Sequence, residues 1–355
     1  MEVENLKEIF DQFQHLNVYE SYKELSSGHI NDTYLIITKT RPYFVLQRIN
    51  HSVFKDVAGL INNKVAISQH IKSKLKESKK QVLDFVKSND DNSYYKDIKG
   101  NYWSLMYYID NSVTYETVND IEIAYEGGKL FGEFLNLTSD FDTSQLTEVI
   151  PKFHNMSFRY SQFQSALQSA AKERLFKATE TINMVTELKE EMHILQNLKE
   201  SGDIKLRVTH NDTKISNALF TKDNKGLCVI DTDTVMPGIV HYDFGDAIRT
   251  ICNSAAEDEA NLDLVNFNFD FYKAYTRGFL EEIQSSLTDL EIKYLPLGAK
   301  TMTYIMALRF LTDYLNNDIY YKIKYEDHNL VRAKNQLKLI ESFSEKIKEI
   351  QQEII

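Results

Sequence analysis

The chain has 355 residues with a net charge of −11, and 43% of them are hydrophobic. This length is enough to bury a full core and predicts two lobes or domains. The acidic balance argues against a nucleic-acid partner, because the sequence shows no basic patch. The two cysteines, Cys228 and Cys252, stand among apolar residues and are predicted to be buried free thiols in a reducing compartment.

No targeting or membrane segment is evident in the sequence. The chain begins with the acidic, polar stretch Met1–Asn5, which does not resemble a signal peptide. No apolar run approaches the ~18 residues that a membrane span requires. We therefore expect a cytoplasmic protein that binds neither nucleic acid nor a membrane. The sequence leaves the oligomeric state open and favours a monomer.

The first third of the chain alternates short apolar runs with turns, a pattern typical of a β-meander. Apolar residues at helical spacing predict helices before and after the first three strands. The predicted elements are a helix over 4–16, strands over 22–25, 32–37 and 43–49, a helix over 54–76, and strands over 82–86 and 102–109.

The rest of the chain is predicted to be mainly helical, with one hairpin inside it. Small residues in the first of these helices indicate close packing against a neighbour. The predicted helices cover 123–137, 165–200 (one or two helices), 267–284, 289–317 and 326–353. The region 208–234 is predicted to hold a loop and a strand, with a hairpin turn over 221–226 between them. The expected fold class is therefore α+β, with a first domain over 1–109 and a helical second domain over 110–355.

The central motif is His210-x-Asp212-x-x-x-x-Asn217, which is followed by an apolar run ending in Asp231. Phosphoryl-transfer enzymes need an Asp near the substrate hydroxyl, together with an Asn and a second Asp on a metal ion. A carboxylate reaches a phosphate only through a cation, because both are negative. The pattern predicts Asp212 as the catalytic base and Asn217 and Asp231 as Mg²⁺ ligands. A polar hairpin is the alternative, since Asn and Asp are common in turns.

A second motif, Asp243-Phe244-Gly245, has the letters of the D-F-G motif of protein kinases. It begins 31 residues after Asp212 and opens a predicted helix, whereas Asp231 ends a strand. We expect Asp243 and Asp246 to cap that helix or to tie its start to the catalytic loop. His210 is expected to pack under the loop and orient it.

Three stretches together resemble the N-acetylhexosamine 1-kinases of the aminoglycoside phosphotransferase and choline kinase superfamily. These stretches are Ser27–Tyr34, Thr209–Lys214 and Ile230–Gly238. The resemblance covers nearly the whole chain. It implies a protein-kinase-like bilobal fold with a small antiparallel β-sheet lobe and a larger, mainly α-helical lobe. It also implies ATP and Mg²⁺ as cofactors.

The resemblance implies where the nucleotide binds. The first turn of the meander covers the ATP phosphates in such lobes, which makes Ser27 and Gly28 candidates. A single glycine is a weak signal, and an ordinary hairpin fits the turn equally well. The adenine lies against the chain that leaves the small lobe, so Tyr107, Tyr108 and Ile109 are candidates there, with a plain aromatic strand as the alternative.

The residue that binds the α- and β-phosphates is left open. Aligning Phe44-Val45-Leu46-Gln47 with the V-A-I-K strand of kinases places Gln47, which carries no charge, at the lysine position. Alternation along the strand points Arg48 to the opposite face. A bulge that re-aims Arg48, or binding by Mg²⁺ and backbone donors, would also account for this departure.

The substrate candidates come from both lobes. His29, Asn31 and Asp32 belong to the first turn and the strand after it. Asp233 follows Asp231 by two residues, so in a strand both side chains would face the same side, toward sugar hydroxyls or a second metal.

Two further candidates come from the C-terminal helical region. The resemblance assigns Arg309 and Tyr320 to the sugar site. The alternative for Arg309 is a salt bridge to Asp313, one helical turn later.

The reaction implied by the resemblance is phosphorylation of N-acetylglucosamine or N-acetylgalactosamine at the anomeric hydroxyl. One alternative is a related kinase of another small alcohol: an aminoglycoside, choline, homoserine or a plain hexose. Another is a non-catalytic pseudokinase. The intact Asp212, Asn217 and Asp231 argue against it, and the substituted lysine position argues mildly for it. A protein kinase is disfavoured, because no long activation segment separates Asp231 from Asp243.

Overall fold

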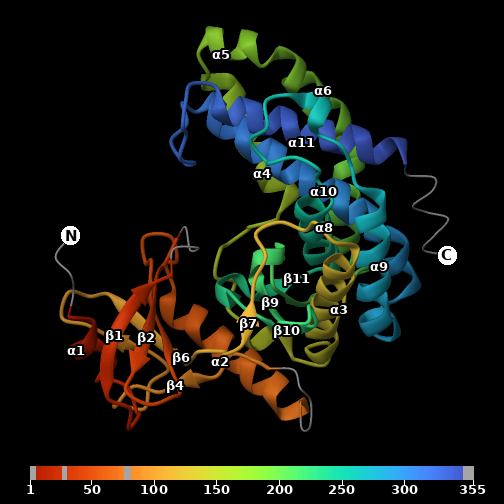
Figure 1. Cartoon of the computed structure of the whole chain (residues 1–355). Coiled ribbons are helices and arrows are strands. Elements are labelled where there is room, and N and C mark those ends of the chain that lie inside the picture. Colours follow the sequence, from red (N-terminus) through yellow and green to blue (C-terminus); the bar gives the residue numbers. More distant parts are fainter. Residues whose placement is uncertain (1–4, 26–29, 76–80, 347–355) are drawn as a thin grey trace. The chain divides into compact units, whose positions relative to one another are not determined.

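The computed structural model describes residues 5–25, 30–75 and 81–346. The chain divides into two compact units, each assembled from several stretches (Figure 1). Unit 1 comprises Met1–Thr114, Leu137–Pro151 and Asn217–Pro237, and unit 2 comprises Tyr115–Asn136, Lys152–Ser216 and Gly238–Ile355. The domain boundary after residue 109 stays a prediction.

Unit 1 is built on an antiparallel sheet with the strand order β1-β2-β3-β6-β4, and β5 also pairs with β6. The meander predicted for the first three strands is confirmed, and the later strands are shorter than expected. The strands are β1 (Tyr19–Glu24), β2 (Asp32–Thr38), β3 (Phe44–Ile49), β4 (Phe85–Val86), β5 (Tyr95–Lys96) and β6 (Tyr102–Tyr107).

Two helices accompany this sheet. Helix α1 (Leu6–Phe10) packs Leu6 and Phe10 into the apolar cluster of the sheet. It is shorter than the predicted 4–16, because Phe13 pairs its backbone with Ser88 in a β-bridge. Helix α2 (Val57–Lys74) starts at Asp56, whose carboxylate accepts a hydrogen bond of 2.8 Å from the Gly59 amide. Such an N-cap satisfies an amide that the helix itself leaves unpaired.

The predicted hairpin is confirmed as a second small sheet of unit 1, with the strand order β10-β9-β7. Its strands are β7 (Ser112–Val113), β9 (Ala218–Thr221) and β10 (Gly226–Val229). Leu227 and Cys228 of β10 pack against Leu83 and Ile109. Because β10 ends at Val229, Asp231 lies beyond the strand. Two other short strands are β8 (Arg207–Thr209) and β11 (Met236–Gly238).

Unit 2 is helical, as predicted, and is organised around the long helix α10. This helix packs against α4, α6, α8 and α11 (Figure 1). The helices are α3 (Ile121–Leu137), α4 (Met156–Ser169), α5 (Lys172–Lys177), α6 (Thr179–Met192), α7 (Ile194–Glu200), α8 (Val240–Ile251), α9 (Phe269–Ile283), α10 (Asp289–Leu315) and α11 (His328–Glu345).

The close packing predicted for the first helix of this region is confirmed at α3 and α9. A Cβ added to Gly128 would lie 2.2 Å from the carbonyl oxygen of Tyr275. A Cβ added to Gly278 would lie equally close, 2.2 Å, to the carbonyl oxygen of Tyr125. Glycine at both positions therefore allows the two helix backbones to approach each other.

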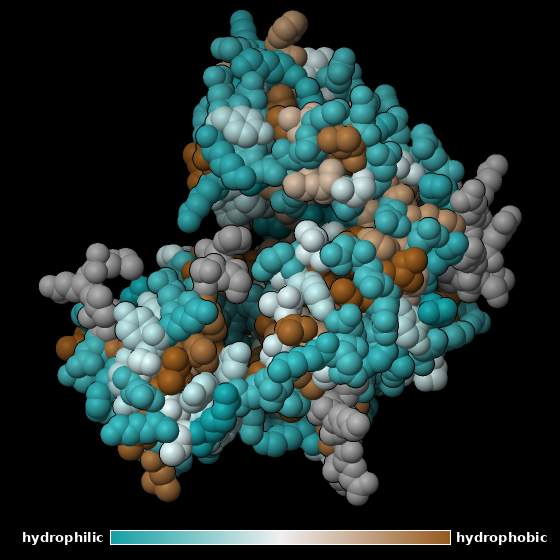
Figure 2. Space-filling model, in the orientation of Figure 1, coloured by the Kyte–Doolittle hydropathy of each residue, from teal (hydrophilic) through white to brown (hydrophobic). Residues whose placement is uncertain are grey.

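On the face shown in Figure 2, hydrophilic residues cover most of the surface, and hydrophobic residues form small, separate groups. Among the residues that the structure describes, no helix is both long enough and apolar enough to span a membrane. Cys228 and Cys252 are buried free thiols, as predicted. Burial raises the pKa of Cys228 to about 12, and it raises that of Cys252 well above its ordinary value.

Candidate active site

The loop that carries Asp212 belongs to unit 2 and begins with a sharp turn after β8. Asn211 has a φ of 65°, in the left-handed region that Asn tolerates better than most residues. Its side-chain amide donates to the hydroxyl of Thr209 at 2.9 Å, which stabilises the turn. The chain therefore changes direction at Asn211, between strand β8 and the loop that begins with Asp212.

Two carboxylates of α8 hold this loop. The two oxygens of Asp243 accept hydrogen bonds from the backbone amides of His210 and Asn211, both at 2.7 Å. Asp246 accepts from the amide of Thr213 at 3.1 Å, and the Thr213 hydroxyl donates to the carbonyl oxygen of Asp243 at 2.6 Å. The predicted tie between the start of this helix and the catalytic loop is confirmed.

His210 packs beneath the loop, as predicted. Its ring is fully buried and lies edge-on to Phe131 and Phe134, with both pairs of ring centroids 5.9 Å apart. Its Nδ1 accepts from the backbone amide of Asp212 at 3.3 Å. The Asp212 side chain stays 35% exposed, and the Lys214 ammonium lies 3.2 Å from its carboxylate. The loop is thus anchored from below while Asp212 faces outward.

Unit 1 contains a buried polar cluster that the sequence patterns did not predict. Lys64 of α2 donates to the Gln47 side-chain oxygen at 3.0 Å and forms an ion pair with Asp233. The Asn31 amide donates to the other oxygen of Asp233, and the Asn31 oxygen accepts from the backbone amide of Asn50 at 2.7 Å. Lys64, Gln47, Asn31 and Asp233 are all buried.

The cluster places a lysine beside Gln47. In protein kinases a lysine on this strand pairs with an acid on the helix. Here the strand residue is the neutral Gln47, and the lysine comes from the helix. Arg48 pairs with Asp32 at 2.6 Å, and its guanidinium lies 5.8 Å from the ring centre of Trp103. It therefore points away from Gln47, as the alternation along β3 predicts.

The sequence did hold a signal for Lys64. It lies four residues after Leu60 and seven before Ile71, so it falls on the apolar face of the predicted helix. A charged side chain there needs a partner. Its neighbour Asn63 is also buried, and its amide donates to the carbonyl oxygens of Thr147 and Val235 at 2.8 and 2.9 Å.

The strand geometry assumed for Asp233 is wrong. Strand β10 ends at Val229, Asp231 has a φ of 56°, and Thr232–Thr234 form a 3-10 helix. The rule that residues i and i+2 share one face of a strand does not apply to Asp231 and Asp233. The helical turn directs Asp233 into the cluster with Lys64.

The two predicted metal ligands lie at neighbouring backbone positions in unit 1. The amide of Ile230, next to Asp231, donates to the carbonyl oxygen of Asn217 at 2.9 Å. In the part of the chain that the structure describes, no group of three or more His, Cys, Asp and Glu side chains is arranged to hold a metal. An ion bound by Asn217 and Asp231 would need further oxygen ligands from phosphate or water.

The other nucleotide candidates are placed only in part. Tyr107 ends β6 and is 38% exposed, while Ile109 is buried. The amides of Tyr107 and Tyr108 donate to the carbonyl oxygens of Asp84 and Tyr43 at 2.9 and 3.0 Å. Ser27, Gly28 and His29 lie outside the described residues.

Arg309 and Tyr320 are brought together, as the resemblance implied. The Arg309 guanidinium lies 5.9 Å from the Tyr320 ring centre. The alternative for Arg309 is wrong, because the Asp313 carboxylate instead accepts from the backbone amides of Tyr320 and Tyr321 at 2.8 and 2.9 Å. These bonds hold the segment after α10, so Asp313 positions Tyr320. Asp313 does not form the salt bridge to Arg309 that the alternative required.

The buried Asp243 carboxyl gives a testable pH dependence. Burial raises its pKa from 3.8 to about 6, although the amides of His210 and Asn211 act in the opposite direction. Between these values the folded protein keeps a proton that the unfolded chain has lost, so stability falls as the pH rises. We expect wild type to lose up to about 3 kcal/mol relative to Asp243→Asn between pH 4 and pH 7.

Urea denaturation across this pH range measures the difference directly. Asparagine does not titrate, so the comparison isolates this carboxyl group. The exposed Asp263→Asn serves as the control and should follow wild type. Parallel stability profiles for wild type and Asp243→Asn would contradict the raised pKa.

The Lys64 ion pair gives a second prediction. Lys64→Met leaves the Asp233 carboxylate buried without its cation, which should cost about 3–5 kcal/mol of unfolding free energy. The double variant Lys64→Met/Asp233→Asn should recover much of this loss, because the remaining amide carries no charge. Urea denaturation of the single and double variants tests this, and additive losses would show that the two side chains do not interact.

Comparison with known proteins places this geometry in a family. The model of the phosphotransferase enzyme family matches residues 21–275, which is most of the chain. Similar solved structures include a microcompartment-associated aminopropanol kinase, with 12% identity, a TM-score of 0.68 and 99% of each chain covered.

Two other structures show the same fold. An amicoumacin kinase in complex with AMP-PNP, Ca²⁺ and Ami has 12% identity and a TM-score of 0.64, covering 96% of this chain and 94% of its own. A choline kinase from Cryptosporidium parvum Iowa II has 14% identity and a TM-score of 0.57, covering 94% and 91%.

These likenesses confirm the predicted α+β, protein-kinase-like fold, with an antiparallel sheet in the N-terminal region and helices in the C-terminal region. The named acceptors of the similar proteins differ widely, so the fold does not select the acceptor. From the family match over most of its length, the chain belongs to the phosphotransferase enzyme family and is a kinase that acts on an alcohol group of a small molecule.

Proposed function

We propose that this kinase transfers a phosphoryl group from ATP to the anomeric hydroxyl of an N-acetylhexosamine, N-acetylglucosamine or N-acetylgalactosamine. The observation that carries the phosphoryl-transfer role is the loop held by Asp243, which leaves Asp212 exposed. The hexosamine acceptor is supported by the sequence resemblance over Ser27–Tyr34, Thr209–Lys214 and Ile230–Gly238.

In this proposal Asp212 orients the acceptor hydroxyl and accepts its proton. The carboxylate can do this because the loop bonds use backbone amides and leave its side chain 35% exposed. The Lys214 ammonium places a positive charge 3.2 Å from it, where the transferring phosphoryl group would carry negative charge. Such enzymes act mainly by positioning and by charge neutralisation.

Asn217 and Asp231 fit the role of Mg²⁺ ligands. Both supply oxygen donors, which this hard cation prefers, and their backbone positions are joined by the bond from Ile230 to Asn217. Mg²⁺ commonly binds through one or two protein ligands and completes its shell with phosphate and water. When bound, it supplies charge neutralisation to the ATP phosphates.

We assign to Lys64 the role of binding the α- and β-phosphates, because Gln47 carries no charge. The hydrogen bond between them places the Lys64 ammonium beside the strand position that holds the lysine in protein kinases. The argument for a pseudokinase is weakened accordingly, since it depended on the substituted strand residue. Asn31 and Asp233 stay candidates for sugar contacts, because each carboxylate oxygen can accept a second hydrogen bond.

Asp212→Asn tests the catalytic assignment. The amide cannot accept a proton at neutral pH, so kcat should fall on the order of 10³-fold, about 4 kcal/mol of transition-state stabilisation. The KM for ATP should change little, because the variant keeps the shape of the loop. Steady-state ADP release measures both constants, and a variant with a tenth of wild-type activity would exclude Asp212 as the base.

Asp231→Ala provides the contrasting control. It removes a proposed metal ligand, so it should raise the Mg²⁺ concentration needed for activity, whereas Asp212→Asn should not. The same Mg²⁺ dependence in wild type and Asp231→Ala would refute the metal assignment and leave Asp212 untouched.

The acceptor hydroxyl is tested with N-acetylglucosamine and its methyl glycoside. The glycoside blocks O1 but keeps the hydroxyls at C3, C4 and C6, so a 1-kinase should release no ADP above background with it. The phosphorus signal of the product should couple to the anomeric proton. Efficient phosphorylation of the glycoside would move the reaction to another hydroxyl, and a panel of other alcohols would then identify the acceptor.

A further inference from the structure

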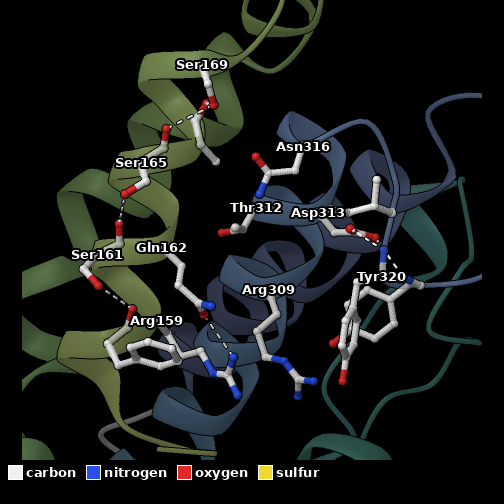
Figure 3. Close-up of a pocket in the computed structure, with 14 residues that line it drawn as sticks. Arg159, Ser161, Gln162, Ser165, Ser169, Arg309, Thr312, Asp313, Asn316 and Tyr320 are labelled. Carbon is white, nitrogen blue, oxygen red and sulfur yellow. Dashed lines mark hydrogen bonds between the residues drawn. The ribbon is translucent and has the colours of Figure 1, made fainter. Parts of the chain in front are cut away.

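Unit 2 contains a cavity of about 570 Å³ between α4, α10 and the segment that follows α10. Arg159 and Gln162 line it from α4, Arg309 lines it from α10, and Tyr320 and Tyr321 line it from the segment. Figure 3 shows the guanidinium groups of Arg159 and Arg309 directed toward the same end of the pocket as the Tyr320 side chain. Two cationic side chains thus converge on one cavity.

Neither arginine has an acidic partner among the described residues. Arg159 donates to the carbonyl oxygen of Phe153 at 3.0 and 2.8 Å and to the Gln162 oxygen at 3.0 Å. Arg309 contacts the sulfur of Met306 at 3.5 Å and otherwise lies over aromatic rings. All these partners are neutral, so within the described residues neither guanidinium forms a salt bridge.

One carboxylate, that of Asp313, lines the cavity, and both it and the nearby Glu257 have partners of their own. Asp313 accepts from the backbone amides of Tyr320 and Tyr321 and from the Asn329 amide at 2.9 Å. Glu257, which acts electrostatically on Tyr321, forms a salt bridge of 2.7 Å with Arg249. The pKa of Arg159 is lowered to about 10, first by burial and then by the positive charge of Arg309. An anion in the cavity would offset the repulsion between the two positive charges.

A buried hydroxyl lies beside the two arginines. The hydroxyl oxygen of Tyr321 is buried and has no hydrogen-bond partner among the described residues. Arg309, Tyr320 and Arg159 all act electrostatically on this group, which places it at the cationic end of the cavity. A buried donor without a partner is costly, and a ligand that accepts from it removes the cost.

His154 lies within electrostatic range of both the two arginines and a residue that holds the loop. This buried ring interacts electrostatically with Arg309 and Arg159 on one side and with Asp246, which holds the loop at Thr213, on the other. Burial lowers the pKa of His154 to about 3, so the ring is neutral near pH 7 and adds no charge to the cavity. A ligand in this cavity would therefore lie on the loop's side of unit 2.

We propose that this cavity binds an oxyanion group carried by the acceptor, a carboxylate or a phosphate, between the guanidinium groups of Arg159 and Arg309 with the Tyr321 hydroxyl as a further donor. The inference rests on the proposed sugar kinase function and names the acceptor class as an acidic sugar derivative. A guanidinium matches the planar carboxylate and the phosphate group in shape as well as in charge. A cationic aminoglycoside or choline would meet two positive charges that nothing neutralises.

Paired acceptors test this assignment. N-acetylglucosamine is compared with N-acetylglucosamine 6-phosphate and with N-acetylmuramic acid, which carry a phosphate and a carboxylate and keep O1 free. We expect kcat/KM to be at least about tenfold higher for one of the acidic sugars, as one charge-assisted hydrogen bond would produce. Which one is preferred identifies the anion. Equal or better turnover of the neutral sugar would overturn the inference and leave the proposed function intact.

Binding without turnover separates the two proposals. Calorimetry with each acidic sugar, and with inorganic phosphate alone, reports the cavity even if no hexosamine is phosphorylated. Tighter binding of an acidic sugar than of N-acetylglucosamine supports the anion site whether or not the kinase assignment holds. Binding of inorganic phosphate with no preference for an acidic sugar would overturn the claim that the anion belongs to the acceptor.

Tyr321→Phe is the most informative variant, because it removes only the hydroxyl that has no partner. A purely structural Tyr321 predicts an unchanged or higher Tm and unchanged kinetics. We expect an unchanged Tm, an unchanged KM for ATP and a KM for the preferred acidic sugar raised several-fold, as for a lost hydrogen bond. An unchanged acceptor KM would remove Tyr321 from the site.

Arg159→Gln should raise the KM for the acidic sugar about tenfold or more, and Arg159→Lys, which keeps the charge, should restore part of it. Lys293→Gln is the matched control, since it removes one positive charge from an exposed position on α10 outside the cavity. It should leave the acceptor KM unchanged. Equal effects of Arg159→Gln and Lys293→Gln would show that only the net charge matters and would overturn the site.

Discussion

The catalytic loop depends on one buried carboxylate. Asp243 accepts from two consecutive loop amides while it sits in the first turn of α8, and α8 packs on the central helix α10. The loop geometry is therefore set by the helical core of unit 2. Burial works against the charge on Asp243, as its raised pKa shows, and the two amides offset part of this cost. These bonds use backbone amides of the loop, and the Asp212 side chain stays 35% exposed.

In unit 1 the buried lysine is on a helix, whereas protein kinases carry it on a strand. Gln47 occupies the strand position, and Lys64 reaches it from α2. A buried ammonium needs an acid, and Asp233 supplies it from the 3-10 turn after β10. Helix, sheet and turn are held together by a cluster in which Lys64, Gln47 and Asp233 each satisfy another member. The cluster also places the Lys64 ammonium beside Gln47, the strand position that holds a lysine in protein kinases.

In the cavity of unit 2, by contrast, the half-buried cations have no acidic partner among the described residues. Its two arginines contact carbonyl, amide, sulfur and aromatic partners, and Asp313 is engaged in holding the segment that bears Tyr320 and Tyr321. Uncompensated charge in a half-buried cavity favours ligands of the opposite sign. Solved structures of similar fold are named for quite different acceptors, so the fold alone does not select the acceptor.

The sequence by itself determined the local features: the meander, the hairpin before Asp231, the helical second half and the H-x-D-x-x-x-x-N motif. These depend on residue spacing and turn chemistry, which act over a few positions. Only the tertiary structure decided the partners of Lys64 and Asp313 and the turn that takes Asp233 out of strand geometry. Those outcomes depend on side chains far apart in sequence, and a buried charge reveals that it needs a partner without revealing which residue the fold will bring to it.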